Sequence, residues 1–131
     1  MQKISEDIAL QDFERWFDSK KLSGSYRKES YEVIEKQMVE AICDGNLIVN
    51  EDFTLTLKLA FPLTAPNEVN ELNFVHRIQT GTLQARTAWA KTQEQKLLAT
   101  IAALTGVEGG VIRALDSSDY SRAGAIASYF F

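Results

Sequence analysis

The sequence predicts an α+β, mostly helical domain with an N-terminal helical hairpin, a small antiparallel β-sheet and a C-terminal helical bundle. Apolar residues recur at three- and four-residue steps up to residue 43, and they alternate with polar residues from 47 to 74. Helical spacing then returns from residue 81 onward, and turn-forming residues separate the three regions. At 131 residues, the chain has the length of one domain with one core. We therefore expect one domain over residues 1–131, made of segments 1–45, 46–78 and 79–131.

Two amphipathic helices account for the first segment. Residues 5–19 start with acids and are followed by two lysines, which suits the helix dipole. Residues 30–43 are expected to form the second helix, which Asp44 and Gly45 end. The apolar faces comprise Ala9, Phe13, Trp16 and Phe17 in the first helix, and Tyr31, Ile34, Met38 and Ile42 in the second.

Three strands account for the middle segment. Leu47 and Val49 alternate with polar neighbours, and the alternation continues over residues 53–61 after a turn at 50–52. Pro62 and Pro66 are expected to bound a loop, because proline donates no hydrogen bond to a sheet. A third strand is expected over residues 72–77.

The last segment contains several helical pieces. Gly81 and Thr82 are expected to open the first, and Thr92 begins a Thr-x-x-Gln capping box for the next, which Gly106 ends. A short piece with an apolar face follows. The cluster Asp116, Ser117, Ser118 and Asp119 offers N-caps for the final helix, whose apolar stripe comprises Tyr120, Ala123, Ala127 and Phe130.

Composition restricts the classes of function. A formal net charge of −4 disfavours nucleic acid and acidic membranes as partners. A single cysteine forms no internal disulfide, the amino terminus has acids where a signal peptide needs an apolar run, and no stretch has the length to span a bilayer. We expect a soluble protein of the cytoplasm.

Residues for catalysis are sparse. Cys43 and His76 are the only thiol and imidazole, and nothing in the sequence brings them together. Metal-ligand spacing is absent from the sequence, and GVEGG at 106–110 lacks the pattern of a phosphate loop. We expect no enzyme, no cofactor and no metal.

A series of short motifs follows in a characteristic order. An alternating strand that ends in proline (LTLKLAFP, 55–62) precedes a second strand that closes with arginine (LNFVHR, 72–77). A glycine–leucine helix start (GTL, 81–83), LTG at 104–106 and LD…DY at 115–120 follow. This order and spacing resemble the small tail assembly chaperones of long-tailed bacteriophages and prophages. Ile78 stands where that family often has proline, and the segment before residue 47 has no counterpart in its short members.

The resemblance implies a non-catalytic protein that binds the tape-measure protein and helps recruit tail tube subunits in the host cytoplasm. The alternative is a small helix-turn-helix regulator, because LLATIAALTGVEGGVIRAL reads as two helical pieces joined by a glycine turn. Against it, the second piece offers only Arg113 as a cation. Whether Arg113 and Arg122 share one exposed basic face distinguishes the two interpretations.

Two aromatic groups are the candidate partner-binding residues. The first is the stripe of the N-terminal helix, and the second is the chain end, where we expect Tyr129 or Phe131 to face outward and to contact a client helix or a second copy of the chain. The alternative for both groups is packing against the chain's own core. The candidates are Phe13, Trp16, Phe17, Tyr129, Phe130 and Phe131.

Overall fold

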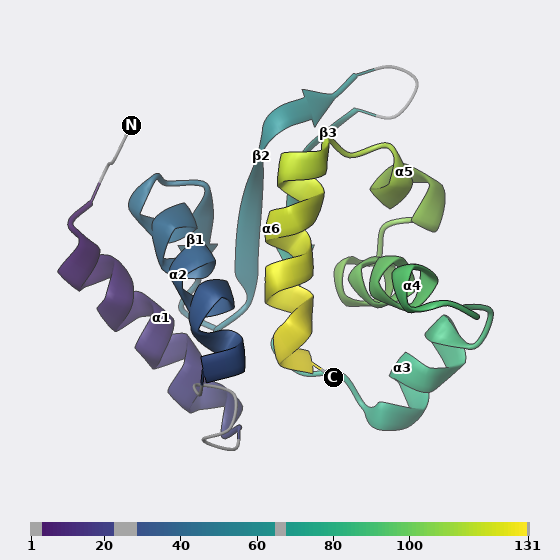
Figure 1. Cartoon of the computed structure of the whole chain (residues 1–131), viewed down its shortest axis with the longest axis horizontal. Coiled ribbons are helices and arrows are strands. Elements are labelled where there is room, and N and C mark those ends of the chain that lie inside the picture. Colours follow the sequence, from purple (N-terminus) through teal and green to yellow (C-terminus); the bar gives the residue numbers. More distant parts are fainter. Residues whose placement is uncertain (1–3, 23–28, 65–67, 131) are drawn as a thin grey trace.

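The computed structural model describes residues 4–22, 29–64 and 68–130 (Figure 1). These residues form six α-helices, a closing 3₁₀ turn and three strands. In chain order, they are α1 (Glu6–Lys20), α2 (Glu29–Cys43), β1 (Leu47–Val49), β2 (Leu55–Leu63), β3 (Val69–Phe74), α3 (Thr80–Thr87), α4 (Gln93–Thr105), α5 (Gly109–Arg113), α6 (Ser117–Ala127) and η2 (Ser128–Phe130).

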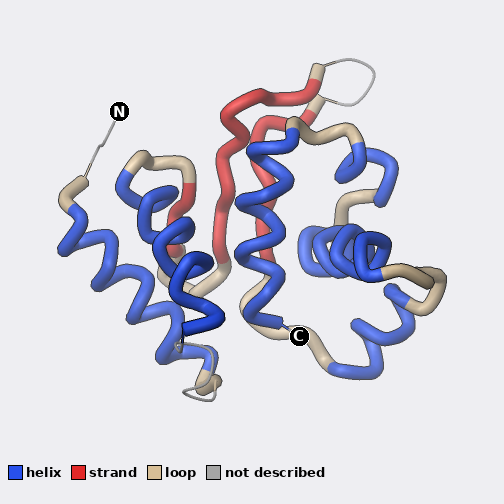
Figure 2. The backbone as a smooth tube through the Cα atoms, viewed as in Figure 1, coloured by secondary structure: helices blue, strands red, loops and turns tan. Residues whose placement is uncertain are grey.

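The three strands form an antiparallel sheet in the order β1-β2-β3, with Leu57 of β2 opposite Leu47 on one side and Leu72 on the other. The α1–α2 hairpin lies beside β1, while α6 contacts β2, α2 and α4. Figure 2 shows the sheet between the N-terminal hairpin and the C-terminal helices. The predicted fold class, mostly helical α+β with a small antiparallel sheet, is confirmed.

One hydrophobic cluster joins these elements. Its fully buried side chains come from the helices and from the strands. The alternating apolar positions of β2 and β3 pack against the same core as the apolar stripes of the helices. They include Phe13, Met38, Leu55, Leu57, Leu72, Phe74, Ile101, Leu104, Ile112 and Ile126.

The predicted helix ends are confirmed where local chemistry sets them. The Thr92 hydroxyl accepts a hydrogen bond from the Gln95 N–H at 3.1 Å, and the Asp116 carboxylate accepts one from the Ser118 N–H at 3.0 Å. Gly106 has φ +71°, the left-handed conformation that ends α4. At the end of α2, Gly45 has φ +80° and the N–H of Asn46 donates to the Ala41 carbonyl, which is a Schellman motif.

The strand boundaries differ from the prediction. β2 continues through Pro62 to Leu63, because its pairing with β3 is irregular between Lys58 and Leu63 and a residue without an N–H is tolerated there. At its other end, Phe53 belongs to the turn, with φ +66°. β3 begins earlier than predicted and ends at Phe74, because the next N–H donates to the Leu104 carbonyl of α4. Pro66 lies outside the described residues.

Candidate partner-binding groove

An open groove of about 910 Å³ lies over the outer face of α2. We call it the α2 groove: it is lined by Glu6, Asp7 and Leu10 of α1 and by residues between 33 and 44, from α2 and the turn after it. Its position follows from the hairpin, in which the N–H of Ile4 donates to the Cys43 carbonyl at 3.2 Å and so sets the start of α1 beside the end of α2. The groove therefore runs along α2 toward its C-terminus.

The floor of the α2 groove is partly apolar. Val39 and Cys43 are buried beneath it, and Leu10 is half-buried at its side. Val33, near the start of α2, lies at the other end of the groove. Its side chain is 74% exposed, which is high for an aliphatic residue on a helix with a separate buried stripe. An occupant of the groove would cover this side chain.

The rim of the α2 groove is acidic. The described residues that line it carry five carboxylates and one ammonium group, that of Lys36. The acids are contributed by the first turn of α1, by α2 and by the residue that follows α2, and they are Glu6, Asp7, Glu35, Glu40 and Asp44.

The two ends of this rim differ in their relation to the helix dipoles. Glu6 and Asp7 lie in the first turn of α1, where the positive end of the dipole stabilises them. Glu40 and Asp44 lie at the end of α2, which has no basic residue in its last turn, so the negative end of the dipole adds to their charge. The end of α2 therefore combines two carboxylates with the negative end of the dipole, while Arg122 of α6 lines the adjoining hollow.

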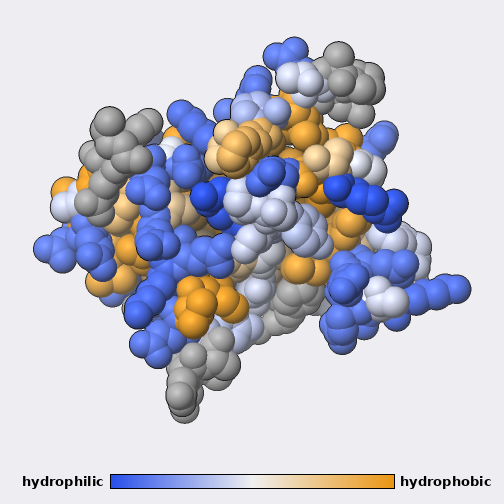
Figure 3. All heavy atoms as spheres, turned by 45° about the horizontal axis from the view of Figure 1, so that its top comes forward, coloured by the Kyte–Doolittle hydropathy of each residue, from blue (hydrophilic) through white to orange (hydrophobic). Residues whose placement is uncertain are grey.

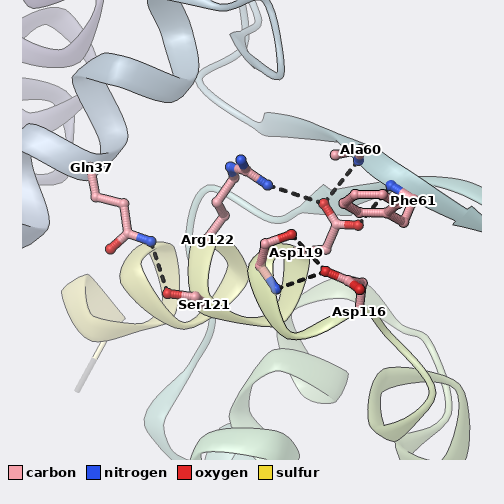
Figure 4. Close-up of polar contacts among 8 residues, drawn as sticks. Gln37, Ala60, Phe61, Asp116, Asp119, Ser121 and Arg122 are labelled. Atoms are coloured by element: carbon pink, nitrogen blue, oxygen red, sulfur yellow. Dashed lines mark hydrogen bonds and ion pairs between the residues drawn. The ribbon is translucent and has the colours of Figure 1, made fainter.

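A second hollow of about 210 Å³ continues the α2 groove toward α6 and shares Gln37, Glu40 and Asp44 with it. The Gln37 side-chain amide donates to the Ser121 hydroxyl at 2.9 Å and so connects α2 to α6 (Figure 4). The outer face of α2 thus lies between two hollows. One elongated ligand laid across α2 would contact both.

Four of the six predicted partner residues are buried in the chain's own core. Phe13, Trp16, Phe17 and Tyr129 are at most 7% exposed, and the Tyr129 ring lies 5.5 Å from the Trp16 ring, centroid to centroid. Tyr129 was expected among the outward-facing residues, and its burial follows from the 3₁₀ turn that replaces the last turn of the helix. Core packing, the alternative interpretation, is what the structure shows for these four residues.

The other two candidates differ from these four. Phe130 is half-buried, and the Lys20 ammonium lies 3.5 Å from the centre of its ring, a cation–π contact. Phe131 lies outside the described residues.

Lys20 is the least expected member of the core. Its side chain is 8% exposed and its ammonium group donates to the His76 carbonyl at 2.5 Å. Burial, followed by the nearby charge of Arg77, lowers the pKa of Lys20 from 10.5 to about 8. The His76 ring lies within hydrogen-bonding distance of the Ser19 hydroxyl, at 3.0 Å. Burial, followed by the charges of Lys20 and Arg77, lowers the pKa of His76 as well.

No pattern in the sequence indicates this contact between α1 and the loop after β3, because Lys20 and His76 are 56 residues apart. His76 lies in that loop and not in a strand, while Cys43 is buried at the end of α2. In the described part of the chain, no three or more His, Cys, Asp or Glu side chains gather as a metal site would require.

The arrangement of the arginines bears on the helix-turn-helix alternative. α5, the would-be recognition helix, has five residues. Arg113 is exposed, but Arg122 is half-buried and forms an ion pair with the fully buried Asp119 at 3.3 Å (Figure 4). The two side chains therefore do not form one exposed basic face.

Hydrophobic residues also reach the surface at the far end of the β2–β3 hairpin. Figure 3 shows them gathered at this end of the molecule, where Phe61 is 60% exposed. The described helices are each too short or too polar to cross a lipid bilayer.

Comparisons of the chain with protein-family models, with curated proteins and with solved structures found no match.

Proposed function

We propose that this chain is a non-catalytic tail assembly chaperone of a long-tailed bacteriophage or prophage. In this role, it binds the tape-measure protein in the host cytoplasm, keeps it soluble and helps recruit tail tube subunits. The observation that carries the proposal is the order of the motifs. They fall on consecutive elements, from β2 and β3 through the start of α3 to the junctions of α4, α5 and α6.

Residues of these motifs take part in the core and in the contacts between elements. Leu104 and Leu115 are buried, and Gly106 takes the left-handed conformation that ends α4. Asp119, of the DY motif, is fully buried and accepts hydrogen bonds from two backbone N–H groups of β2, the strand with which the motif series begins. The first and last motifs of the series are therefore in contact. This contact is a structural reason for the two motifs to occur together, and it supports the resemblance to the tail assembly chaperones.

The physical requirement on such a chaperone is a surface for a long helical client. A tape-measure protein exposes apolar helical faces until the tail tube encloses it, and those faces aggregate unless covered. The α2 groove, with its apolar floor and acidic rim, is the described surface that fits a helix.

Co-expression tests this proposal. The chain is produced together with a tape-measure protein, a very long helical protein whose gene we expect beside that of the chain, and the soluble fraction of that protein is measured with and without the chain. We expect soluble tape-measure protein, and its co-purification, only when the chain is present. An insoluble client in both cases would contradict the proposal.

A DNA-binding assay tests the alternative function. For duplex DNA, we expect no binding tighter than roughly 10⁻⁴ M near physiological salt. A sequence-dependent nanomolar shift of duplex DNA would instead favour the regulatory alternative.

A further inference from the structure

We propose that the α2 groove is the client site and that its occupant is a cationic amphipathic helix, with lysine or arginine on both sides of an apolar stripe. The source of that helix, the tape-measure protein, rests on the proposed function. The chemistry of the occupant follows from the groove alone.

The charge of the groove sets the sign of the occupant. Five carboxylates face one ammonium group among the described lining residues. Anionic partners such as acidic lipid surfaces and nucleic acids are repelled by this rim. A cationic partner is attracted to it, and its charges are matched at close range once bound.

The end of α2 strengthens this preference. Glu40 and Asp44 lie beside carbonyl groups that carry the negative end of the helix dipole, and the described last turn supplies no basic side chain to balance them. A lysine or arginine of the occupant would supply the missing positive charge. We therefore place the densest positive charge of the occupant over the end of α2.

The floor determines the shape of the occupant. Val33 and Glu40 lie seven residues apart on the same face of α2, and Gln37 lies between them. From Val33 to Cys43, α2 rises by about 15 Å, or nearly three turns of a partner helix packed along it. An apolar stripe of three turns would cover Val33 and Leu10, while its flanking cations reach the rim. This is the helix-in-groove mode of peptide recognition.

Charge reversal at the end of α2 tests the proposal. The double variant Glu40→Lys/Asp44→Lys is compared with Glu51→Lys/Glu68→Lys, which makes the same change in net charge at exposed positions outside the groove. Both are mixed with a soluble helical fragment of the tape-measure protein, and with a designed Leu/Lys amphipathic peptide of about 18 residues, which spans about 27 Å as a helix. Affinities are measured by calorimetry at low and at high salt.

We expect the groove variant to lose at least about tenfold in affinity for both ligands, whereas the control variant loses less than about threefold. The loss should shrink at high salt, because rim charges are screened. Val33→Ser removes an apolar contact without changing the charge of the groove, and at this 74% exposed position it should weaken binding by a measurable factor while the protein stays folded. Circular dichroism of each variant confirms that it is folded.

The outcomes separate this inference from the proposed function. If tape-measure protein binds the wild type and the groove variant equally, the inference is overturned and the chaperone function stands. If only the peptide binds, and the groove variant loses it, the groove inference stands and the proposed client is wrong. Equal loss in the groove and control variants would show that net charge, not the groove, governs binding, and this also overturns the inference.

Discussion

Asp119 accepts a hydrogen bond of 2.9 Å from the backbone N–H of Ala60, 59 residues earlier in the chain. Its second oxygen accepts from the next N–H, that of Phe61, at 3.0 Å, and Arg122 completes the contacts (Figure 4). These N–H groups lie where the pairing of β2 with β3 is irregular. One carboxylate of α6 therefore stabilises the irregular part of β2, which otherwise has donors without a strand partner.

Replacing Asp119 by Ala should destabilise the fold by about 3 kcal/mol, because the two N–H donors and the Arg122 charge lose their acceptor in a buried place. Urea denaturation measures the change. The matched control is Asp116→Ala, which removes only the N-cap of the same helix and should cost about 1 kcal/mol. A smaller loss for Asp119→Ala than for Asp116→Ala would show that the contact with β2 contributes little.

The buried Lys20 should give the protein a distinctive dependence on pH. Its pKa is about 8 in the folded chain and 10.5 as the ordinary value, so between these values the unfolded chain binds a proton that the folded chain does not. The free energy of unfolding should therefore rise with pH across this window, and the cost of burying the charge is fully present below about pH 8. Urea denaturation at several pH values measures the slope.

The variant Lys20→Met removes the titrating group, so the contribution of Lys20 to this slope should vanish. Lys96→Met, at an exposed position of α4, should keep the wild-type slope. Comparing the variants cancels the contributions of other groups that titrate in this range. A wild-type slope in Lys20→Met would mean that Lys20 keeps its ordinary pKa in the folded chain.

Tyr129 should behave as a core residue. It is fully buried among the rings of Phe13, Trp16 and Phe17, so Tyr129→Ala should cost about 3–5 kcal/mol and lower the melting temperature strongly. Trp89→Ala, at a half-exposed aromatic position, should change stability by less than about 0.5 kcal/mol. Thermal denaturation of the two variants measures both changes in stability. If Tyr129→Ala left the melting temperature unchanged but abolished client binding, Tyr129 would be a partner-binding residue and not a core residue.

Local chemistry explains which features were predictable from the sequence. Thr92 and Asp116 cap helices whose N–H groups lie two or three residues away, and Gly106 ends a helix through its own φ angle. Each needs only neighbours in the sequence. The alternation in β2 and β3 likewise placed Leu57 and Leu72 on the buried face.

Features set by distant contacts or by small changes of helix geometry were not predictable. Asp119 was expected only as an N-cap candidate, because its strand partners lie almost half the chain away. Tyr129 was expected near the surface by extending a 3.6-residue period past residue 127, where the chain turns to 3₁₀ geometry and its side chains rotate to new directions. The α2 groove is not evident from the periodicity, because its rim residues read as an ordinary polar helix face and its floor residues as part of the core.

The acids that we assign to client binding should reduce the stability of the free protein. Glu40 lies in the last turn of α2, where the helix dipole is negative and where the turn itself contains no basic residue. Glu40→Lys should therefore raise the free energy of unfolding, by about 0.3–1 kcal/mol at low ionic strength, and less at high salt. Glu32→Lys places the same charge near the start of the same helix, where it opposes the dipole, so it should lower stability by a similar amount. Urea denaturation of both variants at two salt concentrations measures the two signs. If Glu40→Lys destabilises the chain, the glutamate has a stabilising partner in the free protein, and the end of α2 does not hold an unbalanced negative charge for a cationic client.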